Sequence, residues 1–135
     1  MTSRVLQPEG WARPKGYANG VVAVGRQVFL AGQIGWNAQQ QFESDRLVDQ
    51  VRQALQNIVT LLAEADGRPE HLVRLTWFIT SRDEYLAEMK EIGAAYRDVM
   101  GRAFPPMSVV QVSALIEARA KVEIEATAVV PDVWT

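Results

Sequence analysis

The hydrophobic positions of this chain follow two different periods, and the changes of period mark its predicted elements. Residues 47–65 and 85–99 carry an apolar side chain every three or four positions, which predicts two amphipathic helices. Ser44 and Ser81 precede these stripes and are candidate N-caps, because a serine hydroxyl accepts a hydrogen bond from a first-turn N–H. A glycine and a proline follow each stripe, as expected at helix ends.

β-branched and aromatic residues mark the predicted strands. Five segments have this composition, and the last alternates strictly between apolar and polar residues: 21–24, 27–34, 72–80, 107–113 and 121–130. The first two are separated by a short turn, which predicts a hairpin. The strand–helix–strand unit spanning 27–80 should make its two strands parallel through a right-handed crossover. Prolines and glycines favour an irregular N-terminal arm over residues 1–16.

The predicted order is therefore β-β-α-β-α-β-β, an α+β pattern in a single domain covering residues 1–135. The chain is 48% hydrophobic, enough to bury one core. It has no cysteine and one histidine, His71, so thiolate chemistry and a His-cluster metal site within one chain are excluded.

Composition also limits the partners. A formal net charge of -2 argues against a nucleic-acid partner. No apolar run approaches the ~20 residues needed to span a bilayer, and the first residues lack the apolar core of a secretory signal. We therefore expect a cytoplasmic protein without a membrane partner.

Glu123 and Glu125 are the first candidates for chemistry. The alternation of the last strand places both on one face, ~7 Å apart at ~3.3 Å per residue. If that face meets solvent, they form a polar surface, which is the commoner case. If a second subunit covers it, one of them could hold a water molecule or transfer a proton.

The segment 104–112 supplies further candidates. Its Pro-Pro pair ends the preceding helix, so Met107 and Ser108 stand at the start of a strand, a common place for a ligand site. Ser108 has no base nearby in sequence, and a hydroxyl there more often bonds the backbone. Gly32 lies inside a strand, where it indicates either another group that approaches the backbone closely, or a bulge or tight packing against a helix. Tyr17 is either a pocket wall or simple packing.

Taken together, several segments resemble the RidA/YjgF family of imine and enamine deaminases. The likeness covers residues 14–130 and rests on the order of five segments: Pro14-Lys15-Gly16-Tyr17, Phe29-Leu30-Ala31-Gly32-Gln33-Ile34, Ala54-Leu55-Gln56-Asn57-Ile58, Phe104-Pro105-Pro106-Met107-Ser108 and Val122-Glu123-Ile124-Glu125-Ala126. The resemblance implies a chorismate-mutase-like fold, a mixed sheet with two helices packed on one face, and a homotrimer with ligand clefts between subunits.

The resemblance also implies site residues. Glu123 would orient the attacking water, while Tyr17, Gly32, Met107 and Ser108 would line the substrate cleft. Deaminating members carry at the position of Met107 an arginine that binds the substrate carboxylate, and methionine offers no such donor. A position that often holds asparagine in the family is Gly93 here.

Two functions follow from this departure. The first is hydrolytic deamination of an imine or enamine other than the usual small 2-imino acids. We expect this reaction to need no metal or organic cofactor, because a C=N bond is already electrophilic. The alternative is a non-catalytic trimer that binds a small metabolite or a partner in the same clefts. The endoribonuclease or translation-inhibitor activity attached to some relatives is less compatible with the acidic composition.

Overall fold

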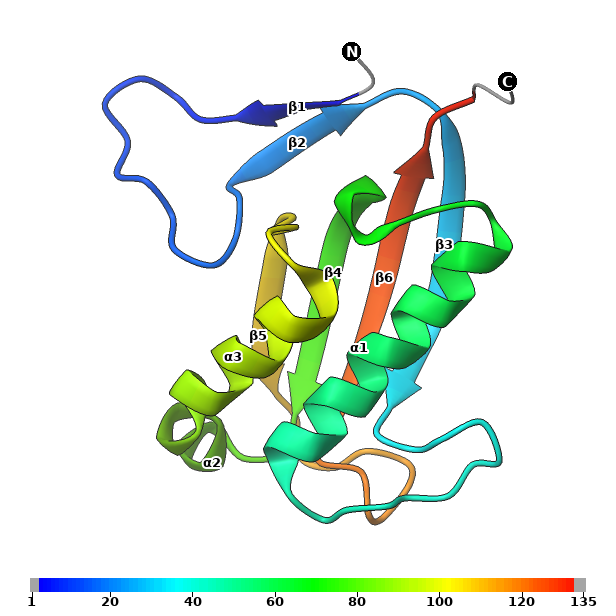
Figure 1. The fold of residues 1–135 in the computed structure, drawn as a ribbon. Helices are drawn as coiled ribbons and strands as arrows, with labels where there is room; N and C mark the ends of the chain where they lie inside the picture. Colours follow the sequence, from blue (N-terminus) through cyan, green and yellow to red (C-terminus); the bar gives the residue numbers. More distant parts are fainter. Residues whose placement is uncertain (1–2, 133–135) are drawn as a thin grey trace.

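A four-stranded mixed sheet forms the centre of the protein in the computed structural model, which describes residues 3–132 (Figure 1). The strand order is β3-β6-β4-β5. The strands are β3 (Arg26–Ile34), β4 (Leu72–Ile79), β5 (Met107–Gln111) and β6 (Val122–Val130). β6 is antiparallel to both β3 and β4, and β4 is parallel to β5. The predicted parallel direction of β3 and β4 is therefore confirmed, but β6 lies between them.

The strict alternation of β6 separates the two faces of the sheet. Its even-numbered positions, from Val122 to Val130, are all buried, whereas Glu125 is exposed and Glu123 is half-buried. Leu75 of β4 stands opposite Ala126 and pairs on its other side with Met107 of β5. Met107 therefore faces the buried side of the sheet.

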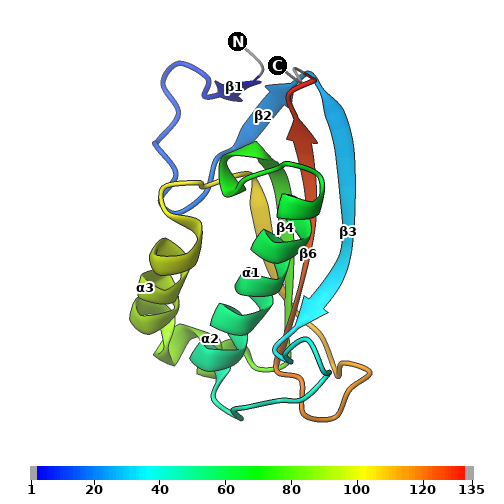
Figure 2. The same cartoon turned by 45° about the vertical axis from the view of Figure 1, so that its right-hand side comes forward.

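Three helices cover that buried face (Figure 2). They are α1 (Leu47–Glu64), α2 (Arg82–Ala87) and α3 (Met89–Met100). The second predicted helix is thus divided in two at Glu88, although Ser81 caps it as expected by accepting a hydrogen bond from the Glu84 N–H. The helices bury a continuous apolar core against the sheet, while the opposite face, called here the open face, carries no helix.

The predicted hairpin between segments 21–24 and 27–34 is wrong. β2 (Gly20–Ala23) pairs instead with β1 (Ser3–Leu6) in a separate two-stranded sheet that projects from the body (Figure 1). The prediction that residues 1–16 form a wholly irregular arm is also wrong, because Ser3–Leu6 forms strand β1. The prolines and glycines of that segment begin at Pro8, so they leave residues 3–6 free to form a strand.

Ser44 lies at the start of α1 but is not its N-cap residue. The helix begins at Leu47 after Arg46, whose side chain makes no capping hydrogen bond. The Ser44 hydroxyl accepts from the Arg46 N–H and donates to Asp49, so it orders the approach to the helix. His71 lies in a short 3-10 turn (Pro69–His71), where its Nδ1 accepts from the Arg68 N–H and partial burial lowers its pKa.

Gln50 holds two loops at the end of the sheet. Although it is polar, its side chain is 1% exposed. It donates to the Ser44 and Arg119 carbonyls and accepts from the Lys121 N–H, so all of these bonds are made inside the protein. Gly35 packs directly on it, and a Cβ there would lie 2.5 Å from the Gln50 Cβ and 2.7 Å from its Cα.

We therefore expect Gly35→Ala to destabilise the protein by about 1–3 kcal/mol, because the added methyl meets the backbone of α1 rather than a movable side-chain end. The matched control is Gly93→Ala in α3, where the nearest atom to a new Cβ is the Arg97 guanidinium at 3.4 Å. That control should be neutral or stabilising by up to about 1 kcal/mol through helix propensity. Urea midpoints at one protein concentration measure both, and equal midpoints would contradict the packing argument.

Candidate functional site

A cavity of about 260 Å³ lies beneath α3, between that helix, the sheet and the loop before β2. We call it the aromatic pocket, because its walls are mainly rings and apolar side chains. Its lining residues are Lys15, Gly16, Tyr17, Trp77, Tyr85, Met89, Ile92, Gly93, Tyr96, Arg97, Phe104, Met107 and Val109. Two lining residues are cations, and none is a carboxylate.

Stacked rings build one wall of the aromatic pocket. Tyr96 lies between Trp77, with ring centroids 6.3 Å apart, and Phe104, at 5.4 Å, and both pairs are close to parallel. The Tyr96 hydroxyl donates to the Ala103 carbonyl, which joins α3 to the chain that enters β5. Burial raises the pKa of Tyr96 and, less strongly, that of Tyr85, so both phenols remain protonated at neutral pH.

Trp77 is nearly enclosed, with 3% of its surface exposed. Its indole N–H is buried and has no hydrogen-bond partner among residues 3–132. The Tyr85 ring meets it edge-on, with an angle of 83° between the two planes. This wall can therefore exclude water and supply flat apolar contacts.

Two of the predicted cleft residues, Tyr17 and Met107, come together in the aromatic pocket. Met107 opens β5 and lies on the helix-covered face. Tyr17 is 42% exposed and belongs to the loop before β2, which the Ala18 N–H ties to the Pro105 carbonyl at 3.3 Å. The Pro-Pro segment therefore leads into Met107, as the sequence indicates, and also binds the loop that carries Tyr17, which the sequence does not indicate.

The other predicted site residues lie on the open face. Gly32 and Glu123 are adjacent, and a Cβ at Gly32 would stand 2.2 Å from a Glu123 carboxylate oxygen. Both interpretations of Gly32 hold: the β3–β6 ladder shifts register between Leu30 and Gln33, as at a bulge, and the group that closely approaches the glycine is Glu123. Ser108 follows Met107 in β5 and pairs with Thr76, which stands opposite Glu125, so the serine also belongs to this face.

The sheet therefore separates the predicted site residues into two groups. Tyr17 and Met107 lie on the helix side, whereas Gly32, Ser108 and Glu123 lie on the open side. Side chains on opposite faces of one sheet point away from each other, so one chain does not bring Met107 and Glu123 into a common cavity. This division was not visible in the sequence, because it depends on the register between three strands.

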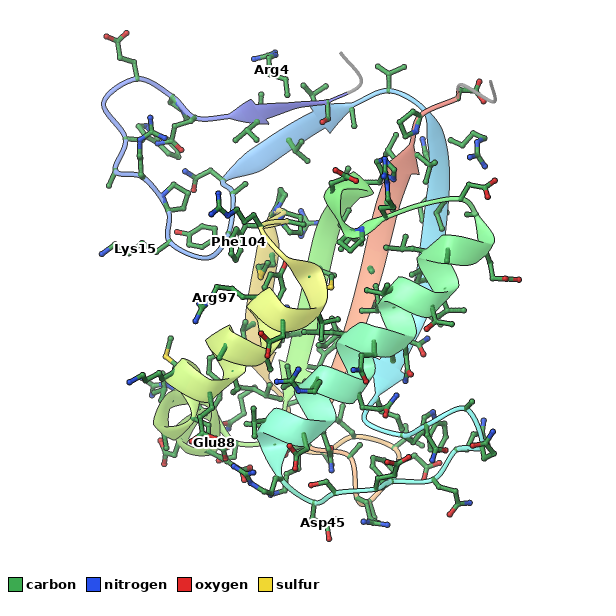
Figure 3. All side chains as sticks on the ribbon, in the orientation of Figure 1. Arg4, Lys15, Asp45, Glu88, Arg97 and Phe104 are labelled. Atoms are coloured by element: carbon green, nitrogen blue, oxygen red, sulfur yellow. The ribbon has the colours of Figure 1, made fainter. Side chains whose placement is uncertain are left out.

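Arg97 is a functional candidate that the sequence argument did not find. It lines the aromatic pocket one helical turn after Gly93, and Figure 3 shows it leaving α3 on the side where Lys15 lies. The available signal in the sequence was the spacing of Gly93 and Arg97, because residues four positions apart in a helix lie on the same face. Within residues 3–132 there is no group of three potential metal ligands, and no helix is long and apolar enough to cross a membrane.

Comparison with known proteins places this chain in a family. The family model described as "Endoribonuclease L-PSP", which represents the RidA/YjgF proteins, matches residues 11–130. The chain belongs to the RidA/YjgF family. The fold expected from the resemblance is therefore confirmed.

Individual proteins are also similar to this chain in sequence or structure. "Protein DfrA" of Myxococcus xanthus is 34% identical over 113 residues, which is 80% of this chain and 79% of that protein. The Rid protein YyfB of Yersinia pestis, described as of unknown function, is 31% identical with a TM-score of 0.83, over 96% of this chain and 100% of its own. Escherichia coli TdcF with bound serine is 29% identical with a TM-score of 0.66, over 93% and 98% of the two chains.

The wall of the aromatic pocket gives one stability prediction. Tyr96→Phe should destabilise the protein by about 1 kcal/mol, because it keeps the stack but leaves the Ala103 carbonyl without its donor. Tyr85→Phe is the control, since the Tyr85 hydroxyl makes no hydrogen bond to residues 3–132, and it should change stability by less than about 0.5 kcal/mol. Thermal or urea unfolding of both variants checks this, and an equal loss in the two would refute the role of the Tyr96 hydroxyl.

Proposed function

We propose that this RidA/YjgF protein hydrolyses the C=N bond of a reactive imine or enamine, in a cleft assembled between copies of the chain. The observation that carries the proposal is the position of Glu123, whose carboxylate is half-buried against Gly32 on a sheet face that no helix covers. A carboxylate held against bare backbone, on a surface ready for a partner, is suited to orient a water molecule.

The reaction needs one proton shuttle. Glu123 accepts a proton from water as its oxygen attacks the imine carbon, and returns a proton to the nitrogen. Glu123 then moves the hydroxyl proton of the tetrahedral adduct to the nitrogen, and collapse of the adduct breaks the C–N bond and releases ammonia and a carbonyl compound. An imine carbon is already electrophilic, so the reaction uses no organic cofactor.

The composite cleft follows from the division of the candidate residues between two faces. If Glu123 and the aromatic pocket act on one substrate, the pocket of one copy must meet the open face of another. Apolar side chains on that face support such an assembly, with Phe29 72% and Val110 42% exposed. We propose the homotrimer that the family resemblance implies.

A second function, ligand binding without turnover, is favoured by Met107. An arginine at this position would offer a carboxylate a bidentate charged partner, whereas the thioether offers a polarisable apolar surface. The relative TdcF was solved with bound serine, which supports a small-metabolite ligand for this fold. The endoribonuclease description of the family gains no support from the net charge of -2.

The assembly is tested first. Sedimentation at micromolar concentration should give a trimer for the native protein, and Phe29→Glu should weaken it, because a charge would be buried in the interface. Leu86→Glu is the matched control, since Leu86 is 48% exposed on α2, away from the open face. A stable native monomer would exclude both the trimer and the composite cleft.

Glu123 should matter for turnover more than for folding. Glu123→Gln preserves the shape of the side chain, so it should remain folded and assembled but lose about 10²-fold or more in imine hydrolysis. The control is Glu125→Gln, which removes a carboxylate two positions away on the same face. Loss of ammonia release in the control alone would assign the base to Glu125, and loss in neither would leave ligand binding as the function.

Met107 should limit the substrate range. The native protein should hydrolyse 2-aminoacrylate or 2-iminopropanoate weakly, because the pocket floor supplies no charged partner for their carboxylate, a contact worth roughly 1.5–3 kcal/mol. Met107→Arg should raise that activity about 10- to 100-fold, whereas Met107→Leu should not. Rapid native turnover of 2-iminopropanoate would disprove the argument from Met107, and a folded Met107→Arg trimer without turnover would favour the binding function.

A further inference from the structure

Among residues 3–132, the two cations of the aromatic pocket have no anionic partner. Neither Lys15 nor Arg97 takes part in a salt bridge or side-chain hydrogen bond with residues 3–132, and no carboxylate lines the cavity. On the same helix face of the molecule, Arg52 is paired with Asp98 at 3.1 Å, one residue beyond Arg97. The pocket therefore has an uncompensated positive mouth above an apolar interior.

Gly93 gives the Arg97 guanidinium its place at this mouth. One guanidinium nitrogen lies 3.4 Å from where a Gly93 Cβ would be, so the side chain folds back over the bare helix backbone. Both residues line the cavity together with Met107, which belongs to the sheet layer. The Arg97 guanidinium therefore reaches the pocket from α3, whereas Met107 reaches it from the start of β5.

The interior fits a flat apolar group. Tyr96 is covered by Trp77 on one face and by Phe104 on the other, so the ring surface left for a ligand comes from the partly buried Phe104 and Tyr85 and the exposed Tyr17. A cavity of about 260 Å³ exceeds the ~150 Å³ that is sufficient for a benzene molecule in another protein. A single aromatic ring with a short acidic side chain therefore matches both the volume and the charge.

We propose that the aromatic pocket binds a single-ring aromatic carboxylate, with the ring against the aromatic wall and the carboxylate on Arg97, assisted by Lys15. Met107 lies beneath the ring as an apolar contact. This inference rests on the proposed function only in taking the aromatic pocket as the ligand half of the cleft. It deepens that function by naming a substrate class, aromatic rather than small aliphatic acids.

Calorimetric titration of the assembled protein with phenylacetate tests the assignment. Phenylacetate should bind, acetate should not bind because it lacks the ring, and phenylacetamide should bind about tenfold more weakly because it lacks the charge. Arg97→Gln should weaken phenylacetate binding about tenfold and leave phenylacetamide binding unchanged. Lys90→Gln removes one charge from the same helix outside the pocket and should leave phenylacetate binding unchanged.

Three results would overturn the proposal: no native binding of phenylacetate, equal affinity for phenylacetate in Arg97→Gln and native protein, or an equal loss in Lys90→Gln. Circular dichroism and sedimentation of each variant exclude misfolding as the cause. Glu123→Gln separates this inference from the hydrolase proposal, since it should retain phenylacetate binding. Imine turnover by a native protein that does not bind phenylacetate would reject the aromatic ligand alone, and binding without turnover would reject hydrolysis alone.

Discussion

The alternation of β6 between two neighbouring strands governs the rest of this structure. Its even-numbered side chains close the core beneath the helices, and its odd-numbered ones, including Glu123, are directed to the opposite face. Leu75 of β4 pairs with Ala126 of β6 on one side and with Met107 of β5 on the other, so Met107 faces the same side of the sheet as the even-numbered residues of β6. A one-residue slip in either ladder would move Met107 or Glu123 to the other face, so the register determines which residues can share a site.

The helix layer depends on a small number of ties to that sheet. Tyr96 stacks between Trp77 and Phe104 and donates to the Ala103 carbonyl, which joins α3, the sheet and the entry to β5. In the first turn of α1, Gln50 forms hydrogen bonds with three backbone groups from separate segments. Removing either side chain's hydrogen bonds leaves a buried polar group without a partner, and this lowers the stability of the fold by more than the net contribution of the lost bond.

The open face explains how a small chain can carry a site without completing it. Glu123, Gly32 and Ser108 stand on a surface with no helix, beside exposed apolar side chains such as Phe29. The ligand-sized cavity, with its rings and two cations, lies on the other side of the sheet. In the proposed assembly these two surfaces would meet, so that Glu123 of one copy would face the aromatic pocket of another.

The sequence by itself determined the long, strongly periodic elements. The stripes of α1 and the 85–99 region, the Ser81 cap, the Pro-Pro entry to β5 and the alternation of β6 were all predictable, because each depends on local conformational preference or on period. The family resemblance was also visible there, since it needs only the identity and order of residues.

Tertiary structure decided the pairings between distant segments. β2 pairs with β1 instead of β3, although a turn at Gly25-Arg26 favoured the adjacent strand, because β-pairing depends on long-range partners. The opposite placement of Met107 and Glu123 likewise follows from inter-strand register, and the recruitment of Arg97 follows from α3 packing over the sheet. Local sequence contains none of these distances, so only the folded chain shows that Glu123 and the aromatic pocket lie on opposite sides of the sheet.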